Sequence, residues 1–266
     1  MVEKNKTEAL HKIECFLLDM DGTIYLDNNL LPGAKDFISL LNERGIAYLF
    51  LTNNSSKDAN LYVQKLNKLG VPASKKMILT SGEATATYLQ RKNKGASLFI
   101  VGTPALKKEF VSSGFLISDD EPDMVVLGFD TTLNYEKLWN CCNFIRDGLP
   151  YIATHPDVNC PTKDGFMPDI GSFIALIEAS TGRLPDEIIG KPYTAMVEAI
   201  EFRTGVKREN ICMIGDRLYT DIALGKFGLQ TILVLSGEAT EDDIDDAEIK
   251  PDFVMKDLSE VFQAMK

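Results

Sequence analysis

The stretch that decides the fold lies near the N-terminus, at residues 13–23, and reads IECFLLDMDGT. Its first part, Ile13 to Leu18, is an apolar run that ends in an acidic turn. A helical pattern follows at Gly33 to Gly45, where apolar residues recur at helical spacing before a glycine stop. This stretch therefore predicts a buried strand, a polar turn and then a helix.

The same order of strand and helix recurs along the chain. It returns at residues 46–51 and 57–70, and the second segment is ended by Gly70, Val71 and Pro72. Near the C-terminus the pattern is found again at 211–214, 218–226, 231–235 and 258–265. Such alternation favours an α/β fold with a doubly wound, Rossmann-like parallel sheet and helices on both faces.

The middle of the chain carries a second series of these units. They lie at 98–101, 105–112, 124–127, 135–146, 151–153 and 172–180. Turn residues bracket the series, Thr80 to Gly82 on one side and Thr181 to Pro185 on the other. We therefore predict an inserted α/β domain at 82–183 and a discontinuous core domain formed by 1–81 and 184–266.

The balance of charge excludes several classes of partner. The 266-residue chain has 28 Lys and Arg against 39 Asp and Glu, which gives a net charge of -11. Nucleic acids and anionic membranes bind basic surfaces, so neither is an expected partner. A small molecule is expected instead, and an anionic one would need a divalent cation to offset the acidic field.

Hydropathy and cysteine content predict a location in the cytoplasm. Apolar runs such as Ile46 to Leu51 are far shorter than the roughly 18 residues of a membrane span, and Met1 to Lys12 lacks the apolar stretch of a signal peptide. The five cysteines include no C-x-x-C pair. Reduced thiols are therefore favoured over disulfides or a zinc site.

Two acids follow the first predicted strand. Asp19 and Asp21 are two residues apart, and on an extended chain such side chains point the same way. Ligands of open parallel sheets bind beyond the carboxyl ends of the strands, so both acids are expected in one cleft. Two carboxylates there can divide the duties of nucleophile and general acid/base. The alternative is a plain Asp-Gly turn at the surface.

Polar residues also follow the second predicted strand. Residues 52–56 read TNNSS and lead into a helix. Hydroxyls, amides and free backbone N–H groups at a helix start can bind an anion. The alternative is a simple helix cap made by Ser55 or Ser56.

A single lysine stands in the turn that follows the predicted insertion. Lys191 lies within Ile189 to Pro192, and Pro192 is expected in the first turn of a following helix. The ammonium group either neutralises a phosphate oxygen or a carboxylate, or it is only a solvated charge.

A second acid pair follows the strand predicted at 211–214. Asp216 and Asp221 supply oxygen ligands of the kind that suits Mg²⁺. The alternative is that Asp216 or Thr220 caps a helix and that Asp221 favours its positive end. Taken together, the four strand ends carry an acid pair, a hydroxyl, a lysine and another acid pair. This is a complete set for phosphoryl transfer through an aspartyl phosphate.

In content and order, these four motifs resemble those of the haloacid dehalogenase superfamily, whose phosphatases carry D-x-D-G-T, then Thr or Ser, then Lys, then an acid pair. The insertion between the second and third motifs is similar to the large cap of the branch with NagD-type nucleotide phosphatases and 4-nitrophenylphosphatases. The resemblance extends from Ile13 to Ala264. The third motif departs at Tyr193, where this branch commonly has Asn.

The resemblance implies a role for each reactive side chain. Asp19 would attack phosphorus, and Asp21 would protonate the leaving oxygen and then deprotonate the hydrolytic water. Thr52 would hydrogen-bond the transferred phosphoryl group, and Lys191 would neutralise Asp19 and the phosphate oxygens.

The resemblance also implies a magnesium site and a set of ligand-binding residues. Asp216 would bind Mg²⁺ with the Asp19 carboxylate and the Asp21 main-chain carbonyl, and Asp221 would orient these ligands. The residues expected to bind the substrate or its phosphate are Met20, Asp21, Thr52, Asn53, Asn54, Lys191 and His155.

The best candidate for substrate selection is the loop at 154–159, which reads THPDVN. Its His155 either touches the substrate or is satisfied by local hydrogen bonds. The branch often pairs through its caps, so the resemblance implies a homodimer.

The sequence thus predicts a Mg²⁺-dependent phosphatase for small phosphate monoesters, such as nucleotide, sugar or aryl phosphates. Asp21 distinguishes it from the dehalogenases of the superfamily, which lack this second acid. Two alternatives remain open: a phosphoryl-accepting signalling module, and a catalytically idle binding protein that kept the fold.

Overall fold

The computed structural model describes residues 10–162 and 165–266, so most of the polar segment Met1 to Lys12 lies outside the described residues. By the density of its internal contacts the chain forms two compact units. Unit 1 comprises Met1–Thr52, Tyr62–Leu79 and Ile200–Lys266, and unit 2 comprises Asn53–Leu61 and Thr80–Ala199. The domain limits 1–81 with 184–266, and 82–183, stay a prediction.

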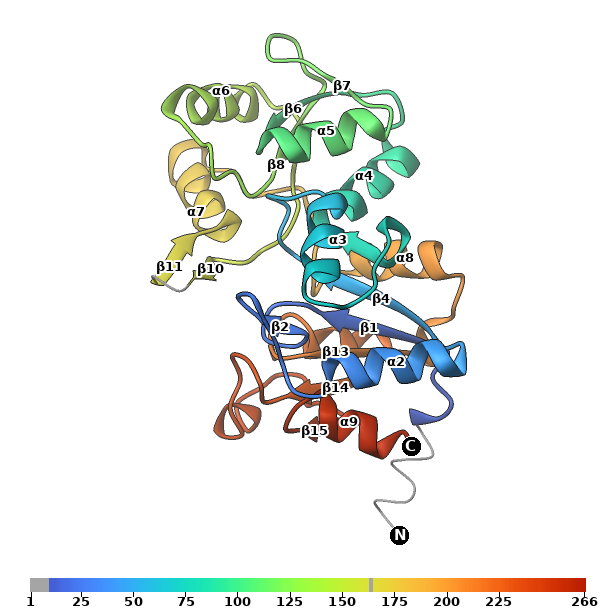
Figure 1. Ribbon diagram of the computed structural model, residues 1–266. Coiled ribbons are helices and arrows are strands. Elements are labelled where there is room, and N and C mark those ends of the chain that lie inside the picture. Colours follow the sequence, from blue (N-terminus) through green and yellow to red (C-terminus); the bar gives the residue numbers. More distant parts are fainter. Residues whose placement is uncertain (1–9, 163–164) are drawn as a thin grey trace. The chain divides into compact units, whose positions relative to one another are not determined.

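Unit 1 is built on a six-stranded sheet with the order β15-β14-β13-β1-β4-β5 (Figure 1). Its registered neighbours, β1 with β13 and β4, and β14 with β13 and β15, are all parallel. The strands are β1 (Cys15–Asp19), β4 (Ala47–Thr52), β5 (Ile78–Thr80), β13 (Ile211–Gly215), β14 (Gln230–Val234) and β15 (Phe253–Met255).

Short elements and helices surround this sheet, and α2 packs against α9. Helices α2 (Ala34–Arg44) and α9 (Leu258–Ala264) belong to unit 1, whereas α3 (Ala59–Lys68) and α8 (Thr194–Thr204) each have residues in both units. The 3-10 turns of unit 1 are η1 (Lys75–Met77), η2 (Arg208–Asn210), η3 (Ile222–Phe227) and η4 (Asp242–Ile244). A small hairpin joins β2 (Tyr25–Leu26) to β3 (Asn29–Leu30).

The central strands form where the sequence is continuously apolar. Nearly every residue of β1 and β4 is buried, as expected for parallel strands covered on both faces. Helix α2 packs its apolar stripe on β1, and the rings of Phe37 and Phe16 meet edge to face with centroids 5.5 Å apart. Such a pair adds about 0.5–1.5 kcal/mol to the burial of its surface. Gly45 ends α2 in the left-handed region, at φ 64°.

Unit 2 has its own five-stranded sheet, ordered β12-β9-β8-β6-β7, with parallel pairs throughout the registered strands. The strands are β6 (Ser97–Val101), β7 (Leu116–Ile117), β8 (Met124–Leu127), β9 (Tyr151–Ala153) and β12 (Glu187–Ile188), and a separate hairpin pairs β10 (Asn159–Thr162) with β11 (Gly165–Pro168). The helices are α4 (Ser81–Lys92), α5 (Pro104–Ser112), α6 (Tyr135–Arg146) and α7 (Ile170–Thr181).

Helices cover both faces of this second sheet (Figure 1). Alternate strand residues, among them Phe99, Val125 and Tyr151, form one core with the buried residues of α6 and α7. On the other side of the sheet, Leu106 of α5 packs against Gly128. A Cβ added to Gly128 would lie only 2.2 Å from Leu106 Cδ2. Two parallel sheets with helices confirm the predicted α/β class.

Three local expectations were wrong or incomplete. The helix expected at 218–226 is reduced to the 3-10 turn η3, because the Asp221 carboxylate accepts the Arg217 N–H at 3.1 Å and Gly225 interrupts the pattern. Helix α8 begins at Thr194, so Pro192 precedes it. Helix α4 was not predicted. Thr80 followed by Glu83 is the sequence pattern of a capping box, and the Thr80 side chain does accept the Glu83 N–H.

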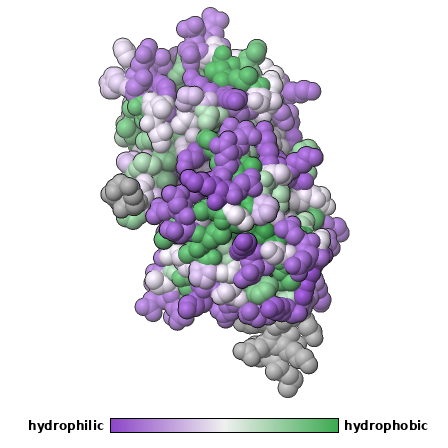
Figure 2. Space-filling model, viewed as in Figure 1, coloured by the Kyte–Doolittle hydropathy of each residue, from purple (hydrophilic) through white to green (hydrophobic). Residues whose placement is uncertain are grey.

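The surface is mostly polar on the face that Figure 2 shows, with hydrophobic residues interspersed among hydrophilic ones. Among the described residues, no helix is both long and apolar enough to cross a membrane.

Candidate active site

The first acid pair leaves β1 in a tight turn. Asp19 is the last residue of the strand, Met20 is fully buried, and the side chain of Asp21 is 53% exposed. The Met20 carbonyl accepts the N–H groups of Ile24 and Tyr25, at 2.9 and 3.1 Å, which closes the turn. Burial thus alternates as expected for an extended segment, and Met20 has only its main chain to offer to a ligand.

The second acid pair follows β13 and is buried. Asp216 is 2% exposed and Asp221 is fully buried. The Glu238 N–H donates to Asp216 Oδ2 at 2.8 Å, and the Arg217 N–H donates to Asp221 Oδ2 at 3.1 Å. These backbone donors therefore fix the orientation of both carboxylates.

Glycines let the main chain come close to these acids. A Cβ on Gly22 or Gly237 would stand 2.3 or 2.0 Å from Asp216 Oδ2. A Cβ on Gly215 would stand 2.3 Å from the Asp221 carboxylate carbon. Gly22 also has a φ of 91°, in the left-handed region that favours glycine. Position 22 therefore needs glycine for two reasons: the turn has a positive φ there, and the Asp216 carboxylate leaves no room for a Cβ.

Three of these acids gather at one point of unit 1. Asp19, Asp216 and Asp221 each offer an oxygen, and these oxygens lie within 4.8 Å of one another. Like charges this close destabilise one another unless a cation offsets them. Carboxylate oxygens are the ligands that Mg²⁺ prefers. The cluster therefore fits a hard divalent cation.

Arg217 adds positive charge next to the acids, and sequence reasoning did not single it out. Its Nε lies 2.9 Å from Glu238 Oε2. Burial works to lower the pKa of Arg217, but the charges of Asp19 and its other acidic neighbours outweigh it and raise the pKa above its ordinary value. The guanidinium therefore stays charged. Its position between Asp216 and Asp221 in the motif was the signal that could have indicated it.

Asp21 has neighbours of its own in unit 1. Lys65 Nζ lies 3.7 Å from Asp21 Oδ1 and 3.6 Å from the centre of the Tyr25 ring. The Tyr25 hydroxyl donates to Asp21 Oδ2 at 3.5 Å, and burial, followed by the charge of Asp21, raises the tyrosine pKa well above its ordinary value. Tyr25 therefore stays protonated, as a donor to the carboxylate. Neither Tyr25 nor Lys65 was a candidate from the sequence.

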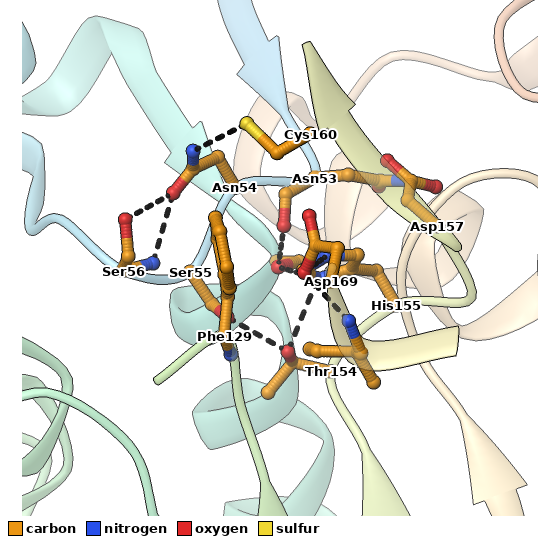
Figure 3. Close-up of polar contacts among 12 residues, drawn as sticks. Asn53, Asn54, Ser55, Ser56, Phe129, Thr154, His155, Asp157, Cys160 and Asp169 are labelled. Atoms are coloured by element: carbon orange, nitrogen blue, oxygen red, sulfur yellow. Dashed lines mark hydrogen bonds and ion pairs between the residues drawn. The ribbon is translucent and has the colours of Figure 1, made fainter. Parts of the chain in front are cut away.

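The second and third motifs meet in unit 2 through Asn53. The Lys191 N–H donates to Asn53 Oδ1 at 2.8 Å, and Asn53 Nδ2 donates to the Lys191 carbonyl at 3.0 Å and to Asp157 Oδ1 at 2.9 Å. Lys191 is 2% exposed. Figure 3 shows Asn53 beside Asp157. Thr52, the preceding residue, ends β4 in unit 1 and is buried.

The two serines of the second motif do not cap the helix that follows. Ser56 donates its N–H and hydroxyl to Asn54 Oδ1, at 2.9 and 2.7 Å, in a local turn. Ser55 Oγ accepts the Phe129 N–H at 2.9 Å (Figure 3). The cap bond of α3 comes from Asp58, whose carboxylate accepts the Leu61 N–H at 3.0 Å. The helix-cap interpretation of Ser55 and Ser56 is therefore wrong.

His155 is fully buried in unit 2, and both of its ring nitrogens have partners. Nε2 lies 3.1 Å from Asp169 Oδ1, and Nδ1 lies 3.3 Å from the hydroxyls of Ser81 and Thr154 (Figure 3). Asp169 Oδ1 also accepts the Ile170 N–H at the start of α7. Local hydrogen bonds thus satisfy the ring, which is the second of the two interpretations that the sequence left open.

The predicted site residues are divided between the two units. Unit 1 holds Met20, Asp21 and Thr52 together with the acid cluster of Asp19, Asp216 and Asp221, and unit 2 holds Asn53, Asn54, His155 and Lys191. The catalytic and substrate-binding roles of these residues stay predictions.

Two family models match the chain. The model described as haloacid dehalogenase-like hydrolase matches residues 16–116, and a second model of HAD-like hydrolases matches residues 188–261. The four motifs at 19–23, 52–56, 189–192 and 216–221 all lie within the matched segments.

Relatives with names match over almost the whole length. An acid sugar phosphatase of Staphylococcus aureus is 35% identical, over 97% of this chain and 100% of its own. The crystal structure of a 4-nitrophenylphosphatase from Thermotoga maritima is 50% identical, with a TM-score of 0.94 over 97% of this chain and 99% of that one. NagD from E. coli K-12 is 33% identical, with a TM-score of 0.87 over 93% and 98%. The chain therefore belongs to the haloacid dehalogenase-like hydrolases, and it is a phosphatase of that family.

Proposed function

We propose that the protein is a Mg²⁺-dependent phosphatase that hydrolyses small-molecule phosphate monoesters through an aspartyl phosphate. The observation that carries this proposal is the cluster of Asp19, Asp216 and Asp221, whose carboxylate oxygens lie within 4.8 Å of one another after two neighbouring parallel strands. The names of the relatives support sugar and aryl phosphates as substrates, and nucleotides belong to the same chemical class.

Two carboxyl groups carry out the bond changes. Asp19 attacks phosphorus while the ester P–O bond breaks, and Asp21 gives its proton to the leaving oxygen. Asp21, now ionised, accepts a proton from the water that attacks the aspartyl phosphate. The acyl phosphate bond breaks, phosphate leaves, and Asp19 is regenerated as a carboxylate.

The remaining motif residues offset charge and orient the phosphoryl group. Asp19, Asp216 and the Asp21 carbonyl would hold Mg²⁺, and Asp221 would orient them. When bound there, Mg²⁺ would supply positive charge that offsets the charge of the acids and of the phosphoryl group. Thr52 donates a hydrogen bond to a phosphoryl oxygen, and Lys191 offsets the charge that develops there.

The partners follow from the same chemistry. We expect a small phosphorylated metabolite in the site, and neither nucleic acid nor membrane, because the net charge of -11 repels both. We also propose a cytoplasmic location and a homodimer formed through the cap. Tyr135 and Trp139, which are exposed and one turn apart on α6, support such pairing, and light scattering of the purified protein tests it.

The test is phosphate release from 4-nitrophenyl phosphate and a panel of sugar and nucleoside monophosphates, with Mg²⁺ or with a chelator. Native protein should hydrolyse these substrates when Mg²⁺ is present and not when a chelator is present. The Asp19→Asn protein should be folded but inactive. If folded native protein releases no phosphate from the whole panel, the proposal fails. Stable phosphoryl acceptance would then favour the signalling alternative, and binding without any transfer would favour the idle one.

A further inference from the structure

Asn53 uses its whole side-chain amide within unit 2. Its oxygen accepts the Lys191 N–H at 2.8 Å, and its nitrogen donates to the Lys191 carbonyl at 3.0 Å and to Asp157 at 2.9 Å. The N–H and the carbonyl of Lys191 fix the orientation of this amide, because a flipped amide would place donor against donor. Asn53 is 5% exposed, so water does not replace these bonds freely.

The approach of Asn53 to Lys191 depends on the glycine between them. A Cβ on Gly190 would stand 2.7 Å from Asn53 Oδ1 and 2.6 Å from His155 Cβ. Gly190 donates its N–H to the Thr154 carbonyl at 2.8 Å, which extends the pairing of β12 with β9. The peptide groups on both sides of the Lys191 Cα are therefore held, and with them the direction in which its side chain starts.

Asp157 braces this arrangement from the loop at 154–159. Its side chain accepts from Asn53, and its main-chain carbonyl accepts the Gly171 N–H at 2.8 Å near the start of α7. Through this bond Asp157, which we call the brace, is held in place by helix α7 of unit 2. Asp157, which belongs to the loop that the sequence suggested for substrate selection, therefore supports Asn53.

We propose that the side chain of Asn53, held by Asp157, positions Lys191 rather than making the phosphate contact that the motif suggested. The inference rests on the proposed function, in which Lys191 offsets the charge of the phosphoryl group. Displacing a catalytic group by about 1 Å can cost roughly 100-fold in rate. Releasing the Lys191 main chain should therefore lower kcat strongly and change KM little.

The decisive experiment is a double-mutant cycle with Asn53→Ala and Lys191→Ala, assayed with 4-nitrophenyl phosphate and Mg²⁺. Asn53→Ala alone should lower kcat by roughly 10- to 100-fold. In the Lys191→Ala protein the same change should cost less than about 3-fold, because the group that it positions is gone. An equal loss in both proteins would show that Asn53 acts by itself and would overturn the inference.

The same four proteins can be compared without turnover. Titration calorimetry in the presence of Mg²⁺ measures the affinity of each for orthovanadate. Folded native protein that releases no phosphate from the whole substrate panel, or Lys191→Ala protein with native activity, would overturn the proposed function itself. An additive cycle in an otherwise active enzyme overturns only the role of Asn53. The two failures are therefore distinguishable.

Variants of the brace guard against loss of folding in Asn53→Ala. Asp157→Ala removes the acceptor and should lower kcat, whereas Asp157→Asn keeps an amide oxygen as acceptor and should lose less. Asn53→Asp sets two carboxylates against each other, and adding Asp157→Asn to it restores a donor, so the double variant should recover part of kcat. Circular dichroism checks the fold of each variant. Equal kcat for Asp157→Ala, Asp157→Asn and native protein would contradict the brace.

Discussion

Gly22 and Asp216 come so close that a Cβ on Gly22 would stand 2.3 Å from Asp216 Oδ2. The two residues are far apart in the sequence, but β1 and β13 are neighbouring parallel strands with Leu18 opposite Ile214. Ser236 adds a hydrogen bond from its hydroxyl to the Gly22 carbonyl, at 2.8 Å. The carboxylate of the second acid pair therefore rests against the main chain of the first.

Gly22→Ala should disrupt this contact. The new methyl group would meet the Asp216 carboxylate, and the φ of 91° adds strain of about 1–2 kcal/mol for a residue with a Cβ. We expect loss of phosphatase activity and a fall in the free energy of unfolding, measured by urea denaturation. Gly70→Ala is the matched control, because Gly70 has a similar φ of 82° with open space around its Cβ position. Equal effects of the two substitutions would contradict the role of the contact.

Asp216→Asn should weaken binding of the divalent cation. It removes one negative charge from the cluster with Asp19 and Asp221. Loss of a group that only orients a metal ligand costs about 10- to 100-fold in metal affinity, so loss of a ligand carboxylate should cost at least as much. Titration calorimetry with Mg²⁺ or Mn²⁺ measures the affinity independently of turnover. Asp36→Asn, an exposed acid of α2, should leave the affinity unchanged. Chelation should abolish activity of native protein, and added Mg²⁺ should restore it.

Glu201 should make stability depend on pH. Arg208 donates to both of its oxygens, at 3.0 and 2.6 Å, and these hydrogen bonds lower the pKa of Glu201 below its ordinary value of 4.5. A lowered carboxyl pKa stabilises the folded state above the unfolded pKa, and this contribution is lost as the pH falls through the folded pKa. Glu201→Gln should therefore cost about 0.5–1 kcal/mol at neutral pH and progressively less below about pH 4.5.

Urea denaturation of both proteins at neutral and acidic pH measures this difference. Glu198→Gln is the matched control on the same helix, because Glu198 lies 3.4 Å from Arg91 in a more exposed pair and should matter less. A cost for Glu201→Gln that is the same at both pH values would rule out the ion pair as its cause.

Ser55→Ala should destabilise the protein through a buried backbone group. Ser55 is fully buried, and its hydroxyl oxygen accepts the Phe129 N–H at 2.9 Å and lies 2.9 Å from Thr154 Oγ1. Leaving that N–H without an acceptor should cost about 1–3 kcal/mol in the free energy of unfolding. Ser112→Ala removes an exposed hydroxyl that bonds the Lys108 carbonyl and should cost less than about 0.5 kcal/mol. Similar costs for both would contradict this account.

Local pattern was sufficient for some elements and not for others. The strands β1 and β4 and the helix α2 were predicted because an apolar run, a helical stripe and a stop at Gly45 are local signals. The segment at 218–226 has a helical pattern as well, but the Asp221 side chain bonds the Arg217 N–H and the segment turns instead. This competing bond spans only four residues, and hydrophobic periodicity does not report hydrogen bonds from side chains to the backbone.

The sequence by itself determined the fold class, the family and the residue types of the four motifs, because strand ends in a parallel sheet and the order of acids, hydroxyl and lysine are legible along the chain. Only the tertiary structure decided which atoms meet. The strand order places Asp19 close to Asp216 and Asp221, and the fold of unit 2 lets Asn53 accept the Lys191 N–H. These contacts join distant segments, and their formation depends on strand pairing and burial that no local pattern specifies.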